Sequence, residues 1–349
     1  MANWTFLQTH KEQHERNLVK LIQNMYDKTC CSLKVKNGLG RKFQTCRGVQ
    51  QGCILSPRLF NIFINDIPTL FGRECHPLKL GKESLSCLMY ADDLVMLSES
   101  PEGLQKCMDK LKAYTLEWGL QINKEKTKVL IFQRCGRRTT PTFLFGDLNI
   151  SIADTYKYLG TTLTYTGSFK TNTNIKKKKG FRAAYLINNN ISKISKASTS
   201  IKIFEKVVEP ILTYNSEVTE AHIPTTWDYD KFKNKIWDTG HELNKVVLGS
   251  LRQIMGVHKK TTNIALMAET GKFPLCLKIY TQITKYWMRF RTTKNSMLHE
   301  AYNICYNDNL DKKKSWMKIV QFLLDYTEMT GENMPSSPKD IDGKIKLFK

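Results

Sequence analysis

The chain has 349 residues, of which 41% are hydrophobic, so it is long enough to bury a sizeable core and to form two or three domains. It carries 54 lysines and arginines against 32 aspartates and glutamates, a formal net charge of +22. This excess of cations favours a polyanionic partner, either nucleic acid or an anionic membrane surface, although a basic soluble protein without such a partner has the same composition.

The N-terminal sequence MANWTFLQTHKEQHERN lacks the basic and then apolar pattern of a secretory signal, and no apolar run approaches the length of a membrane span. None of the ten cysteines belongs to a CxxC pair. We therefore expect reduced thiols, no zinc site, no membrane partner and an intracellular protein, either nuclear or cytoplasmic.

The first third of the chain alternates helical and extended patterns. Apolar residues recur at helical spacing over 17–28, and two short strands, CSLKV and RKFQTC, flank the turn residues NGLG. Ser56, followed by proline, predicts the N-cap of a helix. A further helix is predicted to begin after Ser100 and to end at Gly119.

Beyond residue 120, LQIN and KVLIF predict strands on either side of the basic segment NKEKTK, and GDLNI and YKYLGTTL predict a further pair of strands. The character of the chain changes after residue 165. Residues 170–206 hold ten lysines and arginines and a single acid, Glu205, and the chain to about residue 325 has a helical pattern. The sequence therefore predicts a mixed α+β first part and a basic, α-helical second part.

Two adjacent carboxylates, Asp92 and Asp93, interrupt the apolar stretch LMYADDLVML. Burial of an unpaired carboxylate is costly, and a neighbouring like charge adds to the cost. Successive side chains of a strand point to opposite faces, so both carboxylates can meet one ligand only where a hairpin turn redirects one of them. A hard divalent cation such as Mg²⁺ is the natural ligand, and a solvated Asp-Asp turn is the alternative.

Five blocks in a fixed order resemble the reverse transcriptases of LINE-type retrotransposons, which lack long terminal repeats. YADDLVMLS (90–98) resembles their catalytic hairpin, and GVQQGCILSPRLFNIFINDI (48–67) resembles the motif just upstream. WGLQINKEKTKVLIF (118–132) resembles the next motif, and YKYLG (156–160) resembles the primer-gripping hairpin. LRQIMGVHKKTTNIALMAETGKFPL (251–275) resembles the helical region that such elements carry beyond the thumb.

The resemblance implies an α+β fold with a partial right-hand polymerase palm, in which helices pack on an antiparallel sheet, over residues 1–165. A basic helical thumb would follow over 166–250, and a helical C-terminal region with a loose tail over 251–349. The implied activity is RNA-directed DNA polymerisation by two-metal nucleotidyl transfer, with Mg²⁺ or Mn²⁺ as cofactor. The implied partners are an RNA template, a DNA primer and deoxynucleoside triphosphates.

The resemblance also implies a role for each matched residue. Asp92 and Asp93 would hold the metal, and Lys126 would neutralise or protonate the leaving pyrophosphate. Nucleotide and template would be contacted by Gln51, Gly52 and Tyr90. The primer would be contacted by Tyr158, Leu159 and Gly160. Phosphates would be contacted by Lys176, Lys177, Lys178, Lys179 and Arg182. The alternatives are a solvated lysine at 126, a core leucine at 159 and a basic run that is simply a hydrated face.

The chain departs from the family in one respect. Relatives have a further catalytic aspartate on a strand shortly before the helix expected at 17–28, whereas residues 1–26 contain no aspartate and Glu12 and Glu15 lie in a polar segment. We therefore expect the fingers and the first catalytic strand to be missing and the chain, as an N-terminally truncated form, to have little or no polymerase activity. The alternative is a non-catalytic, retroelement-derived nucleic-acid-binding protein. An intron-maturase-like protein is a third reading, which the block at 251–275 disfavours.

Overall fold

The computed structural model describes residues 13–27, 29–44, 48–133, 140–190, 196–220, 241–293, 296–309, 316–330, 335 and 340–341. The chain divides into two compact units. Unit 1 comprises Met1–Leu78, Leu85–Gln121 and Leu144–Asp147. Unit 2 comprises Lys79–Ser84, Ile122–Phe143 and Leu148–Lys349. The domain boundaries expected at residues 165 and 250 stay predictions.

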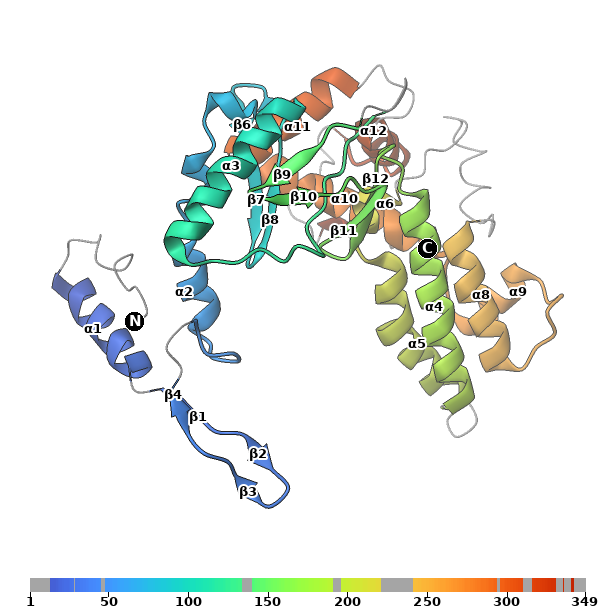
Figure 1. Cartoon of the computed structure of the whole chain (residues 1–349). Helices are drawn as coiled ribbons and strands as arrows, with labels where there is room; N and C mark the ends of the chain where they lie inside the picture. Colours follow the sequence, from blue (N-terminus) through green and yellow to red (C-terminus); the bar gives the residue numbers. More distant parts are fainter. Residues whose placement is uncertain are drawn as a thin grey trace. The chain divides into compact units, whose positions relative to one another are not determined.

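Unit 1 combines helices with short hairpins (Figure 1). Its helices are α1 (Gln13–Asp27), α2 (Ser56–Phe63), α3 (Pro101–Trp118), η2 (Ile67–Leu70) and η3 (Arg73–Cys75). Its strands are β1 (Cys30–Cys31), β2 (Lys34–Val35), β3 (Gly38–Leu39), β4 (Phe43–Gln44), β7 (Cys87–Tyr90) and β8 (Asp93–Met96). The predicted helix near 17–28 is confirmed. The predicted strand pair is confirmed in part: CSLKV and RKFQTC pair through β1 and β4, but Gly38 and Leu39 of the expected turn NGLG form β3, which pairs with β2.

Helix α3 shows why its ends could be predicted. The Ser100 hydroxyl accepts a hydrogen bond from the backbone N–H of Gly103 at 3.0 Å, which satisfies a donor that the first turn leaves free. At the other end Gly119 adopts the left-handed conformation, with φ of 65°, that ends many helices. Between the caps, Met108 and Leu111 are buried in the core of unit 1.

Two strand predictions are wrong. Neither LQIN nor KVLIF forms a strand; their one β pairing in the described chain is an isolated parallel bridge between Val129 and Ile152. The side chain of Asn123 accepts a hydrogen bond from the N–H of Lys126 at 3.1 Å, and its carbonyl accepts one from the N–H of Thr127 at 3.0 Å. The polar segment between the two expected strands is thus a local turn, and the apolar runs beside it lack the partner ladder that a strand requires.

The remaining strands also pair two by two: β5 (Leu78–Leu80) with β6 (Glu83–Leu85), β9 (Phe143–Phe145) with β10 (Leu148–Ile150), and β11 (Thr155–Tyr158) with β12 (Thr161–Thr164). The α+β class is therefore confirmed. Throughout the described ranges the sheets are two-stranded, so the antiparallel sheet expected for a palm is present there only as separate hairpins.

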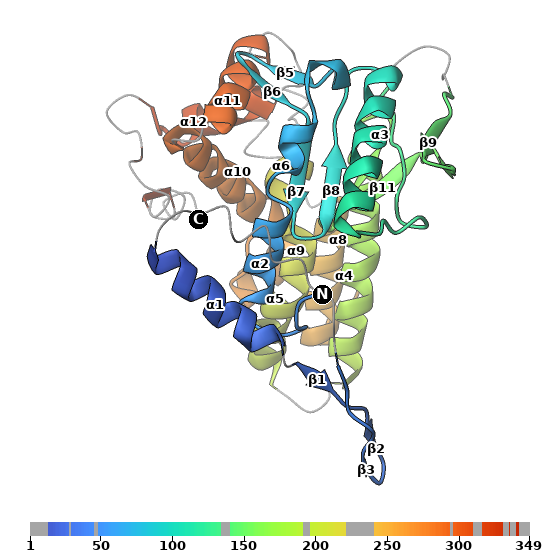
Figure 2. The same cartoon turned by 60° about the vertical axis from the view of Figure 1, so that its left-hand side comes forward.

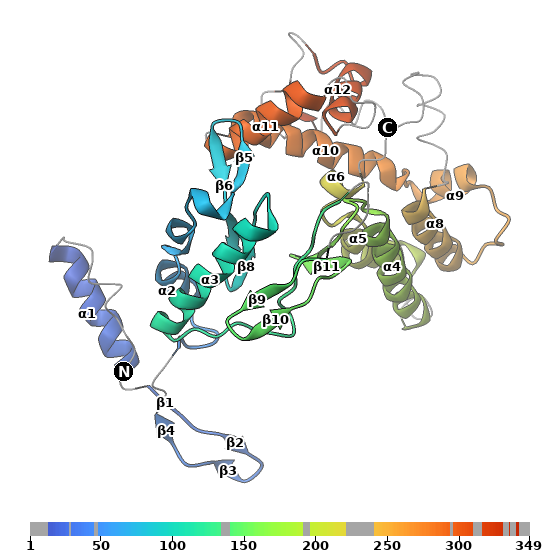
Figure 3. The ribbon, with the colours of Figure 1, turned by 45° about the horizontal axis from the view of Figure 1, so that its top comes forward.

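Unit 2 is mainly helical, as its sequence pattern predicts. Its helices are α4 (Lys170–Asn190), α5 (Ala197–Thr213), α6 (Ser216–Thr219), α8 (Glu242–Met255), α9 (Asn263–Thr270), α10 (Leu275–Thr292), α11 (Ser296–Asn309) and α12 (Trp316–Tyr326). Helix α4 packs against both α5 and α8, and α10 contacts α11 and α12, as Figure 3 shows.

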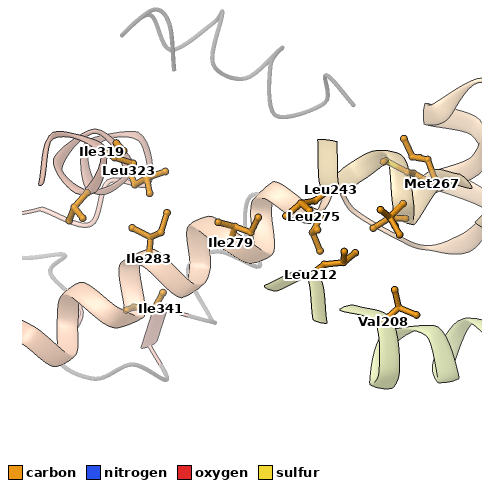
Figure 4. Packing of buried hydrophobic residues seen from close by; sticks show 14 of the residues in the cluster. Val208, Leu212, Leu243, Met267, Leu275, Ile279, Ile283, Ile319, Leu323 and Ile341 are labelled. Carbon is orange, nitrogen blue, oxygen red and sulfur yellow. The ribbon is translucent and has the colours of Figure 1, made fainter. Parts of the chain in front are cut away.

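One continuous apolar core joins these helices (Figure 4). Leu212 of α5, Leu243 of α8 and Ile283 of α10 are each fully buried within it. Amphipathic helices of this kind are stabilised chiefly by burying their apolar stripes against one another. Within the described part of the chain, no helix has both the length and the hydropathy needed to cross a membrane.

Candidate active site

The two adjacent carboxylates lie at the tip of the β7–β8 hairpin of unit 1 (Figure 2). Tyr90 pairs directly with Asp93, so Ala91 and Asp92 form a two-residue turn. Ala91 has a φ of 51°, a left-handed value that few residues other than glycine adopt. Asp92 therefore lies in the turn, outside the alternation of the strands, whereas Asp93 belongs to β8 and remains within it.

Directly paired residues of an antiparallel hairpin share a face. Tyr90 and Asp93 thus lie on the same face as Leu88, and this face is open: Tyr90 is 65% exposed and Leu88 is 42% exposed. Cys87, on the opposite face, is buried. Asp92 and Asp93 are both exposed, so hydration supports their charges and the apolar flanks do not bury them.

The carboxylates of Asp92 and Asp93 provide some, but not all, of the ligands that a divalent cation site needs. Carboxylate oxygens are the ligands that Mg²⁺ and Mn²⁺ prefer, and Asp92 and Asp93 offer two such groups on consecutive residues. Among the described residues, however, there is no group of three or more histidines, cysteines, aspartates or glutamates arranged to hold a metal ion. Asp92 and Asp93 can therefore supply only part of a complete two-metal ligand set.

The loop before α2 carries the two residues expected to contact nucleotide and template. Gln51 and Gly52 are exposed, Gly52 has a φ of 86°, and a Cβ built on it would meet open space. Glycine is thus required by the left-handed backbone here, and it also leaves the backbone accessible to a ligand.

Ser56 holds this loop to α2, although it does not cap the helix as predicted. Its hydroxyl donates to the carbonyl of Gln50 at 2.6 Å and lies 3.3 Å from the Tyr26 hydroxyl at the end of α1. Leu55 occupies the cap position, and it makes no side-chain cap bond. Ser56 is the first residue of the helix and does not precede it, which is why its hydroxyl is not at the cap position.

Lys126 is exposed in the turn begun by Asn123. It belongs to unit 2, whereas Asp92 and Asp93 belong to unit 1. Its contact with a leaving pyrophosphate stays a prediction, and so does the alternative of an ordinary hydrated lysine.

The expected primer-contacting residues lie on the β11–β12 hairpin of unit 2, where Tyr158 pairs with Thr161. Leu159 and Gly160 form the turn, with φ of 43° and 84°. Leu159 is 39% exposed, which contradicts the alternative that it is a core residue. The hairpin tip is held by Tyr214, whose hydroxyl donates to the carbonyl of Leu159 at 2.7 Å.

Tyr214 was not predicted from the sequence. A Cβ on Gly160 would come within 2.9 Å of its ring, so glycine is required at 160 by the ring as well as by the backbone. The neighbouring Asn215 donates from its side chain to the Thr161 hydroxyl at 2.8 Å. These contacts join the hairpin to the C-terminal end of α5, and no local sequence pattern indicates them.

The basic run at the start of α4 does not act as a single patch. Lys176 is 6% exposed, and its ammonium lies 3.3 Å from a carboxylate oxygen of Glu220 and donates to Thr219 at 2.8 Å. Burial lowers the pKa of Lys176, and the pairing with Glu220 opposes this shift. Thr173 also donates to Glu220 at 2.9 Å. Lys176 is therefore unavailable to a phosphate, and the prediction for this residue is corrected.

Lys177 forms an ion pair with Glu242 at the start of α8. By contrast, Lys178, Lys179 and Arg182 are exposed and have no ion-pair partner among the described residues. Of the five predicted phosphate contacts, these three therefore remain accessible to a ligand.

Comparisons with known proteins show what the first half of the chain is similar to. Residues 3–163 match the family model described as "Reverse transcriptase (RNA-dependent DNA polymerase)". The chain is 32% identical over 163 residues to a "Retrovirus-related Pol polyprotein from type-1 retrotransposable element R2" of Nasonia vitripennis, covering 44% of this chain and 16% of that protein. It is 30% identical over 165 residues to the corresponding protein of type-2 element R2DM of Drosophila melanogaster, covering 45% and 16%.

The chain is also 30% identical over 183 residues to an "RNA-directed DNA polymerase from mobile element jockey" of Drosophila melanogaster. This match covers 49% of the chain and 19% of the relative. The chain therefore spans less than a fifth of the length of each of these three relatives.

Proposed function

We propose that the chain carries the site of an RNA-directed DNA polymerase, because residues 3–163 match the reverse transcriptase family model and are similar to proteins of retrotransposons without long terminal repeats. The observation that carries the proposal is the exposed pair Asp92 and Asp93 at a hairpin tip inside the matched segment. The reaction joins a deoxynucleoside triphosphate to the 3′ hydroxyl of a DNA primer and releases pyrophosphate.

Asp92 and Asp93 would hold a divalent cation, Mg²⁺ or Mn²⁺, through their carboxylate oxygens. When bound, the cation neutralises phosphate charge and favours the deprotonated primer hydroxyl. Tyr90 lies on the same hairpin face as Asp93, which suits its ring to a sugar or base at the primer end. Gln51 and Gly52 would contact the nucleotide and the template through the open backbone of their loop.

The primer and phosphate contacts are proposed on unit 2. The turn at Leu159 and Gly160 presents backbone groups at an anchored tip, and Lys178, Lys179 and Arg182 supply free charge. Contacts of this kind position a nucleic acid without reading its sequence. Lys126 is retained as the candidate group that meets the leaving pyrophosphate.

We further propose that the two carboxylates alone support little or no polymerisation, because two-metal transfer needs a third acidic ligand that the described residues do not bring to the hairpin. The same observation, together with the exposed cations Lys178, Lys179 and Arg182 of α4, favours the second candidate function, a nucleic-acid-binding protein without catalysis.

Primer extension separates the two functions. The chain is incubated with a DNA-primed RNA template, deoxynucleoside triphosphates and Mg²⁺ or Mn²⁺, beside an Asp92→Asn variant. Glu117→Gln is the matched control, because Glu117 is an exposed acid on α3 outside the hairpin. Extension by the parent and the control but not by Asp92→Asn supports the polymerase.

Absence of extension by all three proteins, with salt-sensitive binding of the template retained, supports the non-catalytic function. Equal extension by Asp92→Asn and the parent would overturn the assignment of the hairpin as the catalytic site.

A further inference from the structure

Helix α4 carries a mixed aromatic and basic surface, here named the α4 face and defined by Lys178, Phe181, Arg182 and Tyr185. These residues are three or four positions apart along the helix, so their side chains follow one another on one side of it. All four are exposed, Tyr185 by 62% and Phe181 by 42%. The opposite side of α4, which includes Gly180 and Ala184, is buried in contact with α5 and α8. Phe181 lies at the border of the two sides, since one atom of its ring is 3.9 Å from a Cβ built on Gly249 of α8.

The charge of the α4 face is complementary to a polyanion. No acid occurs between residues 170 and 190. Two neighbouring cations have acidic partners, the buried Lys176 in Glu220 and the half-buried Lys177 in Glu242, whereas Lys178 and Arg182 have no ion-pair partner among the described residues. A face whose exposed cations have no acidic partner favours an anionic ligand.

The aromatic side chains identify the kind of polyanion. A lone exposed aromatic is ordinary on a protein surface, but Phe181 and Tyr185 each lie one helical turn from an unpaired cation. Rings interleaved with cations are the arrangement that binds single strands, because each base can stack on a ring while the cations contact the phosphates. In a duplex the base faces are already stacked on one another and cannot meet these rings.

We propose that the α4 face binds an unpaired segment of nucleic acid, with bases against Tyr185 and Phe181 and phosphates on Lys178 and Arg182. From Lys178 to Tyr185 the helix rises roughly 10 Å, which matches about three stacked nucleotides of a single strand. The proposal rests on the proposed function in one point, that the ligand is a nucleic acid. Binding at the α4 face requires neither a metal nor Asp92.

The test is the affinity of the full chain for a fluorescein-labelled 20-nucleotide oligouridine and for a duplex RNA of the same length, measured by anisotropy without divalent metal. Tyr185→Leu should weaken single-strand binding about 5- to 150-fold, the range expected for loss of one stacked base, and change duplex binding less than twofold. Arg182→Gln should weaken both and lower the salt slope of log Kd by about 1.

Phe132→Leu is the matched control, because Phe132 is an aromatic that is 59% exposed and lies outside the α4 face. It should bind both ligands as the parent does, and thermal melting should show that all variants fold. Unchanged single-strand binding by Tyr185→Leu, or equal loss of both ligands, would overturn the proposal.

The polymerase proposal fails independently of this one. Asp92→Asn should bind the oligouridine as tightly as the parent, whatever its extension activity. If the parent extends the primer but does not bind the single strand in preference to the duplex, the proposal for the α4 face is wrong and the polymerase proposal stands.

Discussion

The contact of α4 with α5 and α8 gives the sharpest test of the packing in unit 2. A Cβ added at Gly180 would overlap the Cδ2 atom of Leu212 and lie 3.3 Å from a Cγ of Val246. Leu212 and Val246 are both fully buried, so neither can move into solvent. Gly249 on α8 is the matched control, because its added Cβ would meet only Phe181, at an ordinary 3.9 Å.

Both substitutions to alanine gain about 1 kcal/mol of helix propensity. At Gly180 this gain is opposed by overpacking of a closed core, which typically costs about 1–3 kcal/mol. We therefore expect Gly180→Ala to lower the free energy of unfolding by about 0–2 kcal/mol and Gly249→Ala to raise it by about 0.5–1 kcal/mol. The difference between the two variants, about 1–3 kcal/mol, is the packing contribution.

Urea unfolding followed by circular dichroism at 222 nm measures both values. The double variant Gly180→Ala with Leu212→Val should be more stable than the sum of its single effects, because the smaller side chain makes room for the new methyl group. If Gly180→Ala proves as stable as Gly249→Ala, the close contact of α4 with α5 described here is wrong.

Three further outcomes follow from the described contacts. Lys176→Met removes the lysine partner of the buried Glu220 carboxylate and leaves His241, 3.9 Å away, as its other ionisable contact; it should lower the free energy of unfolding by about 3–5 kcal/mol in urea titrations. A small effect would mean that Glu220 is not charged there or that His241 compensates for the lost lysine. Two lysines lower the pKa of Glu242 from 4.5 to about 2, with Lys177 the larger cause, so the stability from this pairing is present above pH 4.5 and is lost as the pH falls towards 2. The unfolding midpoints of Lys177→Met and the parent should accordingly converge over that range, and a constant gap would contradict it. Burial raises the pKa of Cys107 to about 12, so a disulfide reagent at pH 8 should modify it only on unfolding, long after the exposed cysteines; rapid modification in the native protein would show that α3 is packed differently.

Local chemistry made some elements predictable. Ser100 and Gly119 bound α3 because a cap depends on residues within one turn of the helix end. The turn at Asp92 was predictable for the same reason, since two apolar strands flank it. The exposure of the two carboxylates could not be predicted. Alternation of apolar and polar residues shows that a strand has two faces, but it does not show whether either face is covered by the rest of the protein.

Lys176 shows what a sequence pattern can hide. In the sequence it is one of four identical neighbours, and only its position relative to Thr173, Gly180 and Ala184 distinguishes it. All three are buried, and each is three, four or eight residues away, on the same side of α4. Helical spacing could therefore have separated Lys176 from Lys178, but its partner Glu220 lies 44 residues along the chain and had no local signal.

The proposed metal ligands and the proposed strand-binding face reside on different units. The carboxylates of Asp92 and Asp93 belong to unit 1, and the cations and rings of the α4 face belong to unit 2. Each unit has its own buried core, so a conservative change at an exposed residue of one should leave the fold of the other intact. Asp92→Asn, Tyr185→Leu and the double variant therefore form a cycle in which extension and single-strand binding are lost separately. Loss of strand binding in Asp92→Asn would show that the hairpin is itself a principal binding surface, and the assignment of affinity to α4 would then have to be abandoned.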